Sequence, residues 1–201
     1  MTRRYVAFEG IDGAGKTTVA GRVAERLAGR GFDVLSVREP GGTSTGEAIR
    51  RILLGQGGAV GDWAEALLFA AARSQLAAEV VGPALAQGRA VVSDRSVYSS
   101  LAYQGGARGL GIETVRRVNE AGLGGVWPEQ VVLLRLDPGQ GLAREEAADR
   151  ISAQGLELQI RVAEAYDLLA AAEPDRFVVV DAARPLEAVV AAAEAEVWAR
   201  W

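Results

Sequence analysis

The sequence predicts an α/β protein, in which a mostly parallel sheet of about five strands lies between helices on both faces. Two observations lead to this prediction. Short runs of strand-forming residues alternate with longer helical patterns along the 201 residues. The runs are apolar with few interruptions, which is typical of parallel strands that are covered on both sides. Neither an internal repeat nor a linker divides the chain, so we expect one domain over residues 1–201.

Each expected strand is a short apolar run that ends at a turn or at a charged residue. These runs occupy residues 4–8, 33–37, 90–93, 130–136 and 177–180. Helical patterns separate and follow them, at residues 16–30, 45–54, 63–87 and 185–200. The first pattern stops at Gly31, a residue type that commonly ends helices. The third contains Pro83, which is a candidate position for a kink.

Three further segments lack a clear strand or helix pattern. Residues 104–111 and 122–128 are rich in glycine and are expected to be loops. Residues 144–154 are charged and have no strong apolar face. Composition favours a solvated helix over a mobile flap there, and both readings stay open.

A phosphate-binding loop directly follows the first expected strand and begins the first expected helix. Residues 10–17 fit the pattern G-x-x-x-x-G-K-[ST] in the structural context that this pattern requires. Backbone N–H groups of such a loop surround a phosphate chain, and the start of the helix adds partial positive charge. The residues expected to bind a nucleoside triphosphate are Gly10, Gly13, Ala14, Gly15, Lys16, Thr17 and Thr18.

The composition supports a special role for Lys16. It is the only lysine among 22 basic residues, so 21 positive charges are arginines. A compact amine on a flexible stem can follow the β- and γ-phosphates, whereas a planar guanidinium has a different shape. The hydroxyl of Thr17 can bind Mg²⁺, which makes Mg²⁺ the expected cofactor beside ATP.

Other function classes are excluded or disfavoured by what the chain lacks. It has no cysteine and no histidine, so disulfides, thiolate nucleophiles, Cys/His zinc sites and histidine catalysis are excluded. The net charge of −4 disfavours nucleic acid as a partner. No apolar run approaches the roughly 18 residues of a membrane helix, so no membrane partner is expected. The absence of cysteine fits a cytoplasmic location.

A second group of charged residues follows two of the expected strands. Arg38 follows the second strand, and Asp94 and Arg95 follow the third. Ligands collect at the carboxyl ends of strands in an open α/β sheet, so these side chains are expected to face the phosphate-binding loop. Two arginines there can bind a second phosphate. Asp94 is expected to bind Mg²⁺, partly through water, and the alternative role for it is a helix N-cap.

At this point the chain resembles the bacterial thymidylate kinases, a family of P-loop nucleoside monophosphate kinases with a three-layer fold. Six motifs carry the resemblance in order, between residue 5 and about residue 190. They are EGIDGAGKTT at 9–18, REPGGT at 38–43, FAAAR at 69–73, DR at 94–95, YQGG at 103–106, and DRI at 149–151 with Arg161 and Tyr166 behind it.

The resemblance implies roles for side chains that composition alone does not assign. It implies that Phe69 stacks on thymine, that Arg73 hydrogen-bonds a thymine carbonyl, and that Tyr103 excludes a ribose 2′-hydroxyl. Phe69 and Arg73 are four residues apart, which places both on one face of a helix. Further substrate contacts are implied for Asp12, Arg38, Arg95, Ser100 and Gln104, with Asp12 near the sugar 3′-hydroxyl and a bound metal. Structural roles remain alternatives: core packing for Phe69 and Tyr103, a surface charge for Arg73, a turn for Asp12, and helix capping for Ser99 and Ser100.

The implied reaction transfers the γ-phosphoryl group of ATP to deoxythymidine 5′-monophosphate (dTMP), and the implied assembly is a homodimer. Lys16, Arg95, Asp12 and an arginine of the lid segment 144–154 are the implied catalytic residues. Arg150 is the first choice for that arginine. Arg144 is the second choice, because Glu145 and Glu146 follow it directly and can draw its charge away. Arg144 is also expected to bind ATP. Surface ion pairs are the alternative for both arginines. The lid differs from many relatives, with Ser152 in place of a usual glutamate and Leu158 in place of a usual aromatic residue.

Two other functions remain open at the level of sequence. A deoxyribonucleoside kinase also carries Glu-Pro after the second strand and Asp-Arg-Ser after the third, and there Glu39 would deprotonate a sugar 5′-hydroxyl. The GGT and YQGG segments and the two arginines favour a phosphorylated acceptor instead. A non-catalytic ATP-binding switch would bind ATP without phosphoryl transfer.

Overall fold

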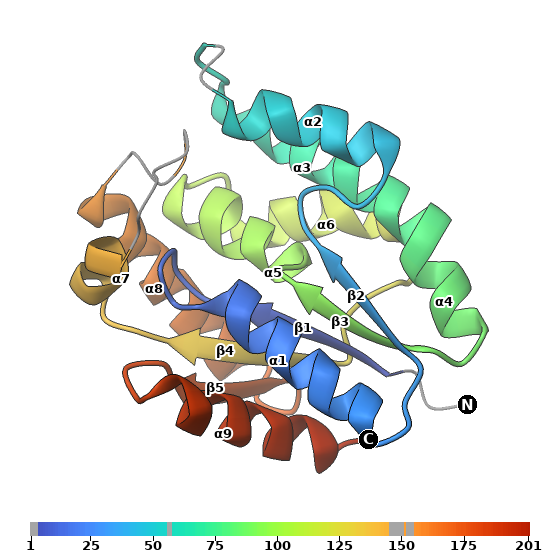
Figure 1. The fold of residues 1–201 in the computed structure, drawn as a ribbon. Helices are drawn as coiled ribbons and strands as arrows, with labels where there is room; N and C mark the ends of the chain where they lie inside the picture. The colour runs from blue at the N-terminus through green and yellow to red at the C-terminus, as the bar shows by residue number, and fades with distance from the viewer. Residues whose placement is uncertain (1–3, 56–57, 145–150, 152–154) are drawn as a thin grey trace.

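The computed structural model describes residues 4–55, 58–144, 151 and 155–201. Its centre is a five-stranded sheet in the order β2-β3-β1-β4-β5, and every neighbouring pair is parallel (Figure 1). The strands are β1 (Tyr5–Glu9), β2 (Val34–Arg38), β3 (Ala90–Asp94), β4 (Gln130–Arg135) and β5 (Phe177–Asp181). The predicted fold class is therefore confirmed, and the strand bounds agree with the expected runs to within one residue at either end.

Burial explains why the strands were predictable. All five residues of β1 are buried, and β3 and β4 are buried except at their last residues. In register, Val6 lies beside Val92 and Phe8 lies beside Val132. Continuous apolar runs are what a parallel sheet between two helical layers requires.

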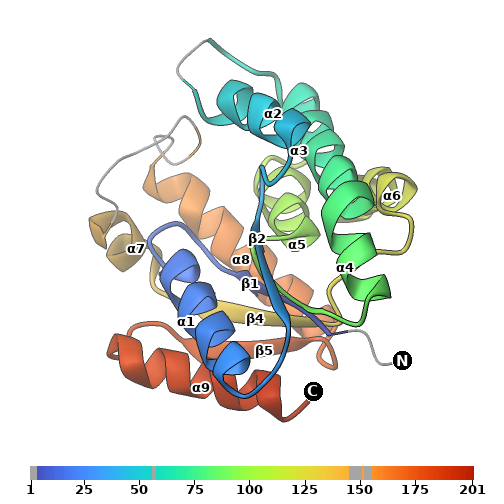
Figure 2. The same cartoon turned by 45° about the vertical axis from the view of Figure 1, so that its right-hand side comes forward.

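Helices cover both faces of the sheet. On one face, α1 (Lys16–Gly29) packs on β1, β2 and β3 and also against α9 (Leu186–Trp198), which lies along β5 (Figure 1). On the other face, α8 (Leu156–Ala172) packs on β4 and β5, and α4 (Gly82–Ala86) packs on β3. The helix α6 (Ile112–Leu123) contacts α3, and α2 (Ser44–Leu54) lies against α3 in an outer position (Figure 2).

The long helical pattern expected at residues 63–87 forms three consecutive segments without an intervening loop. These are α3 (Asp62–Leu76), the π-helical η1 (Ala77–Val81) and α4. The π-helical turn comes directly before Gly82 and Pro83. Proline lacks an N–H donor and its ring crowds the preceding turn, so a local widening of the helix accommodates it.

The glycine-rich segment 104–111 is partly helical, which corrects the expected loop. The π-helical η2 (Leu101–Ala107) continues the short α5 (Val97–Ser100). A Cβ atom on Gly105 would lie 2.9 Å from Ile112 Cα, and one on Gly106 would lie 2.5 Å from Ala165 Cβ. These glycines allow close packing against α6 and α8. The expected loop begins only after Ala107, where Gly109 and Gly111 have positive φ angles.

The sequence did not indicate α6, α8 or the short α7 (Pro138–Arg144). The loop expected at 122–128 begins after Leu123, with Gly124 and Gly125 at positive φ. The lid segment lies mostly outside the described residues, as do Glu145, Glu146, Arg150 and Ser152. Among the helices that the structure describes, none has the length and apolarity needed to span a bilayer.

Candidate active site

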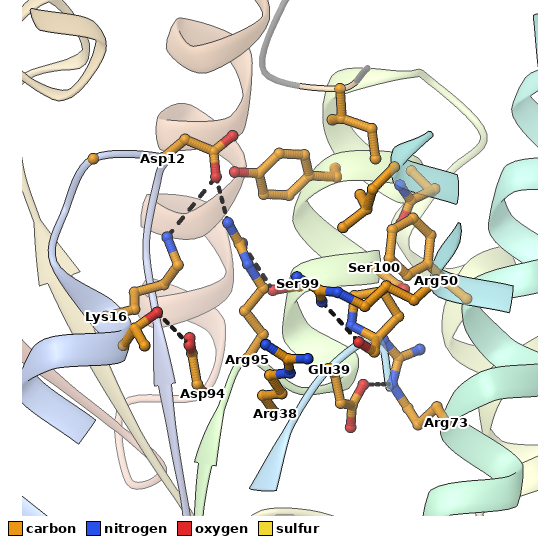
Figure 3. A pocket seen from close by; sticks show the side chains of 18 of the residues that line it. Asp12, Lys16, Arg38, Glu39, Arg50, Arg73, Asp94, Arg95, Ser99 and Ser100 are labelled. Carbon is orange, nitrogen blue, oxygen red and sulfur yellow. Dashed lines mark hydrogen bonds and ion pairs between the residues drawn. The ribbon is translucent and has the colours of Figure 1, made fainter. Parts of the chain in front are cut away.

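A cavity of about 390 Å³ opens at the carboxyl edge of the sheet, where the chain leaves β1, β2 and β3 (Figure 3). The phosphate-binding loop forms one wall. The ends of β2 and β3, with α3, α5 and η2, form the others. The residues that line it are Asp12, Gly13, Gly15, Lys16, Thr17, Thr18, Arg38, Glu39, Pro40, Arg50, Leu54, Phe69, Arg73, Asp94, Arg95, Ser99, Ser100, Tyr103, Gln104 and Ile151. Fourteen of the residues expected from the sequence therefore share one cavity.

Close contacts with the rest of the chain fix the path of the phosphate-binding loop. Gly10, Gly13 and Gly15 all have φ angles that favour glycine. A Cβ atom on Gly13 would lie 2.0 Å from the carbonyl oxygen of Gly141, and one on Gly10 would lie 2.5 Å from the carbonyl oxygen of Leu134. Glycine is therefore required at positions 10 and 13, because the loop packs closely against β4 and α7 there.

Lys16 is buried at the start of α1, and its Nζ donates a hydrogen bond to the carbonyl oxygen of Ile11 at 2.6 Å. Burial, together with the positive charge of Arg95, lowers the pKa of Lys16 to about 8. Asp12 lies 3.9 Å from this nitrogen and opposes the shift. The ammonium therefore lies in a poorly solvated place, where an anionic phosphate is its natural partner.

Asp12 lies between two cations. Its Oδ1 pairs with the guanidinium of Arg95, and the Nζ of Lys16 is 3.9 Å away (Figure 3). Burial acts to raise the pKa of Asp12, but the charges of Arg95 and Lys16 outweigh it and hold the pKa below its ordinary value. Asp12 is therefore an anion that the cations on both sides of the cavity share.

Arg95 occupies an unusual backbone position. Its φ of 70° is the one left-handed angle of a non-glycine residue among those the structure describes. Its guanidinium contacts Asp12, lies 3.3 Å from Ser99 Oγ, and is 5.4 Å from the centre of the Tyr103 ring. A strained backbone that a surrounding network holds in place is typical of functional sites.

Asp94 and Thr17 form a pair of oxygen donors below the loop. The hydroxyl of Thr17 donates to Asp94 Oδ2 at 2.5 Å. Asp94 does not cap the following helix, because Ser96 is the N-cap residue of α5 and accepts from the Tyr98 N–H. A hydroxyl, one carboxylate and the phosphates of a nucleotide are a donor set that suits Mg²⁺. No cluster of three or more potential metal-ligating side chains (His, Cys, Asp or Glu) exists among the described residues.

The far side of the cavity holds an aromatic ring and a buried arginine. Phe69 lines the cavity from α3, and Arg73 lies one turn further along the same helix. Arg73 is buried and donates to Glu39 Oε2 at 2.5 Å, to Asn119 Oδ1 at 2.5 Å and to the carbonyl oxygen of Ser96 at 3.2 Å. It is not a surface charge. Burial raises the pKa of Glu39, although the charge of Arg73 counteracts this.

Ser100, Tyr103 and Gln104 enter the cavity from α5 and η2. The Ser100 hydroxyl is buried and has no hydrogen-bond partner among the described residues. Gln104 donates to Glu65 Oε1 at 3.0 Å, which fixes its amide. Ser100 stands at the N-cap position of η2 but makes no capping hydrogen bond with its side chain. Ser99 does not cap α5 and instead donates to the buried carboxylate of Glu9 at 2.6 Å.

Three expected residues lie elsewhere. Gly10 and Ala14 belong to the phosphate-binding loop but do not line the cavity, because Gly10 packs on β4 and Ala14 is buried. Arg144 is exposed at the end of α7 and donates to the carbonyl oxygen of Ala182 at 3.1 Å. Arg150, the first choice for the lid arginine, lies outside the described residues.

Four residues of the site were not singled out for the roles that the structure gives them. Arg50 lines the cavity from α2 and donates to the carbonyl oxygen of Pro40 at 2.8 Å. Glu9 and Glu39 stood inside quoted motifs, but nothing in the sequence showed that their carboxylates are buried. Gln159 of α8 hydrogen-bonds Asp12 across 147 positions of sequence, and no local pattern could have revealed that contact.

A phosphate-binding loop, an oxygen pair for a metal and facing arginines in one cavity of a parallel sheet define a P-loop kinase. A family model described as thymidylate kinase matches residues 8–193. The chain is 46% identical to the thymidylate kinase of Bifidobacterium longum strain DJO10A, with 98% of each chain covered. It is 47% identical to that of Desulforudis audaxviator, with 100% of this chain and 90% of that protein covered.

A solved structure agrees with these relatives. The crystal structure of thymidylate kinase from Ehrlichia chaffeensis matches with a TM-score of 0.82 and 26% identity, over 97% of this chain and 98% of that one. The chain therefore belongs to the thymidylate kinase family.

Proposed function

We propose that this chain acts as a thymidylate kinase through the cavity described above, with ATP on the phosphate-binding loop and dTMP on the opposite wall. The chain transfers the γ-phosphoryl group of ATP to dTMP and releases ADP and dTDP. One observation carries the proposal: a complete phosphate-binding loop faces Arg95, Phe69 and Arg73 inside a single cavity of about 390 Å³. Both substrates of the reaction thus have binding groups within the same space.

On the donor side, Lys16 binds the β- and γ-phosphates and Thr17 and Asp94 hold the Mg²⁺ that accompanies ATP. Mg²⁺ neutralises part of the charge on the phosphate oxygens when it is bound. Lys16 lies in a buried position that a phosphate can reach, and its lowered pKa reflects the lack of solvation there. Gly13, Gly15 and Thr18 line the same wall, and Gly10 and Ala14 shape the loop behind it.

On the acceptor side, Arg95 and Arg38 bind the phosphate of dTMP. Arg95 is held by Asp12 and Ser99, whereas Arg38 is largely exposed and only 3.6 Å from Glu47. Phe69 stacks on the base, Arg73, Ser100 and Gln104 hydrogen-bond its edge, and Tyr103 packs against the sugar. The unpartnered hydroxyl of Ser100 supports this assignment, since a buried hydroxyl without a partner is costly unless a ligand supplies one.

No general base is required for this reaction. The acceptor oxygen of a monophosphate is already anionic near neutral pH, so catalysis consists of alignment and charge neutralisation. The protein accordingly supplies cations and backbone N–H groups. The alternative, a deoxyribonucleoside kinase, would need a free carboxylate to take a hydroxyl proton, but Glu39 is ion-paired with Arg73 at 2.5 Å.

The test is ADP release with a panel of nucleosides and monophosphates at equal concentration. We expect turnover with dTMP that exceeds turnover with thymidine at least a hundredfold. Preferred phosphorylation of thymidine would favour the nucleoside kinase. ATP binding without turnover on any member of the panel would favour a non-catalytic switch.

The proposal extends to Mg²⁺ dependence, a homodimer and a cytoplasmic location. Addition of a chelator should abolish ADP release, and excess Mg²⁺ should restore it. Support for a dimer comes from Ile52, Trp63 and Leu67 on α2 and α3, whose exposed fractions of 44–55% are high for large apolar side chains. Light scattering coupled to size-exclusion chromatography measures the assembly, and a mass near that of one chain would refute this part. Cell fractionation tests the location.

A further inference from the structure

Gln159 is a buried amide whose two polar ends both contact one residue of the phosphate-binding loop. It lies on α8 and is 1% exposed. Its Oε1 accepts a hydrogen bond from the backbone N–H of Asp12 at 3.1 Å, and its Nε2 donates to Asp12 Oδ2 at 2.8 Å. A single side chain therefore holds both the backbone and the carboxylate of Asp12.

The second oxygen of Asp12 faces the two cations of the cavity. Oδ1 pairs with Arg95 and lies 3.9 Å from Lys16 Nζ. If the carboxylate rotated, it could move closer to Lys16 and weaken its contact with Arg95. The bond from Gln159 to Oδ2 opposes this rotation. It thereby maintains a tight contact with Arg95 and a longer one with Lys16.

The backbone of the loop is held at the same point from another side. A Cβ atom on Gly141 would lie 2.5 Å from the carbonyl oxygen of Asp12, and one on Gly13 would collide with Gly141. The peptide on the carboxyl side of Asp12 is thus fixed by α7, and the N–H on its amino side is fixed by Gln159. Two elements that follow β4 in the chain, α7 and α8, together set the position of Asp12.

We propose that Gln159 is a positioning residue for phosphoryl transfer: by holding Asp12, it directs Arg95 toward the acceptor phosphate and leaves Lys16 available to ATP. This inference rests on the proposed function for the roles of Lys16 and Arg95. Gln159 does not line the cavity, so it acts through Asp12 rather than on a substrate.

The competing interpretation is that Gln159 is only a satisfied polar residue of the core. Gln130 provides the matched control. It is 2% exposed, lies at the start of β4, away from the cavity, and its Nε2 donates to the carbonyl oxygen of Glu196 at 3.0 Å. The replacements Gln159→Leu and Gln130→Leu remove the same polar group from two buried positions.

The first measurement is amide hydrogen exchange of Asp12 by NMR, which needs no substrate. Gln159→Leu should accelerate exchange of the Asp12 amide at least about tenfold, because its acceptor is lost, whereas Gln130→Leu should leave it unchanged. An unchanged Asp12 amide in Gln159→Leu would overturn the inference. This result is independent of dTMP turnover, so the inference and the proposed function can fail separately.

The second measurement is steady-state kinetics. In Gln159→Leu, kcat/KM for dTMP should fall roughly ten- to a hundredfold, as expected for loss of a neutral and a charge-assisted hydrogen bond, while KM for ATP changes less than threefold. Gln130→Leu should keep wild-type values. Equal kinetics in the two leucine variants would refute the positioning role.

Gln159→Glu keeps the test decisive if the leucine variant does not fold. This variant retains the size of the side chain and an acceptor for the Asp12 amide, but it places a carboxylate against Asp12 Oδ2. We expect the slow exchange of the Asp12 amide to be kept and kcat/KM for dTMP to fall at least tenfold. Wild-type kinetics in Gln159→Glu would show that the orientation of the carboxylate does not matter and would overturn the inference.

Discussion

Removal of the Arg73 side chain should destabilise the fold in a way that depends on pH. Arg73 and Glu39 are 3% and 6% exposed, and their Nε and Oε2 atoms are 2.5 Å apart. Arg73→Ala leaves a buried carboxylate without its cation, which costs about 3–5 kcal/mol. For a chain of this size, each kcal/mol lowers Tm by about 2–4 °C. A fall in Tm of roughly 6–20 °C is therefore expected near neutral pH.

The pH dependence follows from the pKa of Glu39. Burial already raises this pKa, and the negative charge of Glu9 raises it further, while Arg73 opposes both. Without Arg73 the folded-state pKa rises again. A carboxyl whose folded pKa lies above its unfolded pKa stabilises the fold at pH values below the unfolded pKa, and that contribution is lost as pH rises through the folded pKa. The fall in Tm that Arg73→Ala causes relative to the wild type should therefore be smaller at pH 5 than at pH 8.

Thermal unfolding followed by circular dichroism between pH 5 and pH 8 is the assay. The control is the double variant Arg73→Ala with Glu39→Gln, in which no ionised carboxylate remains at position 39 and the pH dependence should disappear. The same double variant should also raise KM for dTMP far more than KM for ATP, because the base contact is lost. A loss of Tm that is equal at all pH values, or equal in the single and double variants, would refute this reasoning.

Three further predictions concern single side chains. Lys16→Ala should lower kcat roughly 10²–10³-fold, as for loss of one pre-organised charge in an active site, with an unchanged Tm, and near-normal turnover of Lys16→Arg would contradict the need for a compact amine. Tyr103→Ala should reduce the preference for dTMP over its ribose counterpart roughly tenfold or more; an unchanged ratio of kcat/KM values would contradict the sugar contact. Arg150→Ala should lower kcat roughly 10³-fold with little change in KM for dTMP, and Arg150→Lys should regain part of the rate. If kcat of Arg150→Ala falls less than about tenfold, Arg150 is not the lid arginine of the mechanism and Arg144 is the next residue to test.

The strands and the phosphate-binding loop could be predicted from the sequence because their signals are local. Each strand is a continuous apolar run, and the loop has fixed spacing between Gly10, Gly15 and Lys16. Helix α8 was missed because its many alanines weaken its apolar periodicity. Helix α6 does have an amphipathic pattern, with Val115, Asn119 and Leu123 on its buried face, but it lies between two glycine-rich segments and was overlooked. The η2 segment was mistaken for a loop since its glycines, Gly105 and Gly106, serve close packing against other helices.

The arrangement of charges within the site was harder to predict than its residue types. Arg38, Asp94 and Arg95 could be placed at one edge of the sheet from strand order alone. The partners that restrain Arg73 and Asp12 could not, because Glu39, Asn119 and Gln159 come from distant parts of the chain or from helices that were not predicted. Contacts across such separations depend on tertiary packing rather than on any local pattern.

Under the proposed function, the division of charge in the cavity separates the two substrates of a chain that has nearly all of its cations as arginine. The donor wall carries a single compact amine at Lys16, and the acceptor wall carries guanidinium groups at Arg38, Arg73 and Arg95. The carboxylates contact these arginines to different degrees. Glu39 forms a buried ion pair with Arg73, Asp12 pairs closely with Arg95, and Glu47 is 3.6 Å from the exposed Arg38. An arginine whose charge is balanced by a buried carboxylate suits the neutral edge of a base. An arginine whose charge is only partly balanced still attracts a phosphate. Arg73 therefore suits the base, and Arg95 and Arg38 suit the phosphate that receives the transferred group.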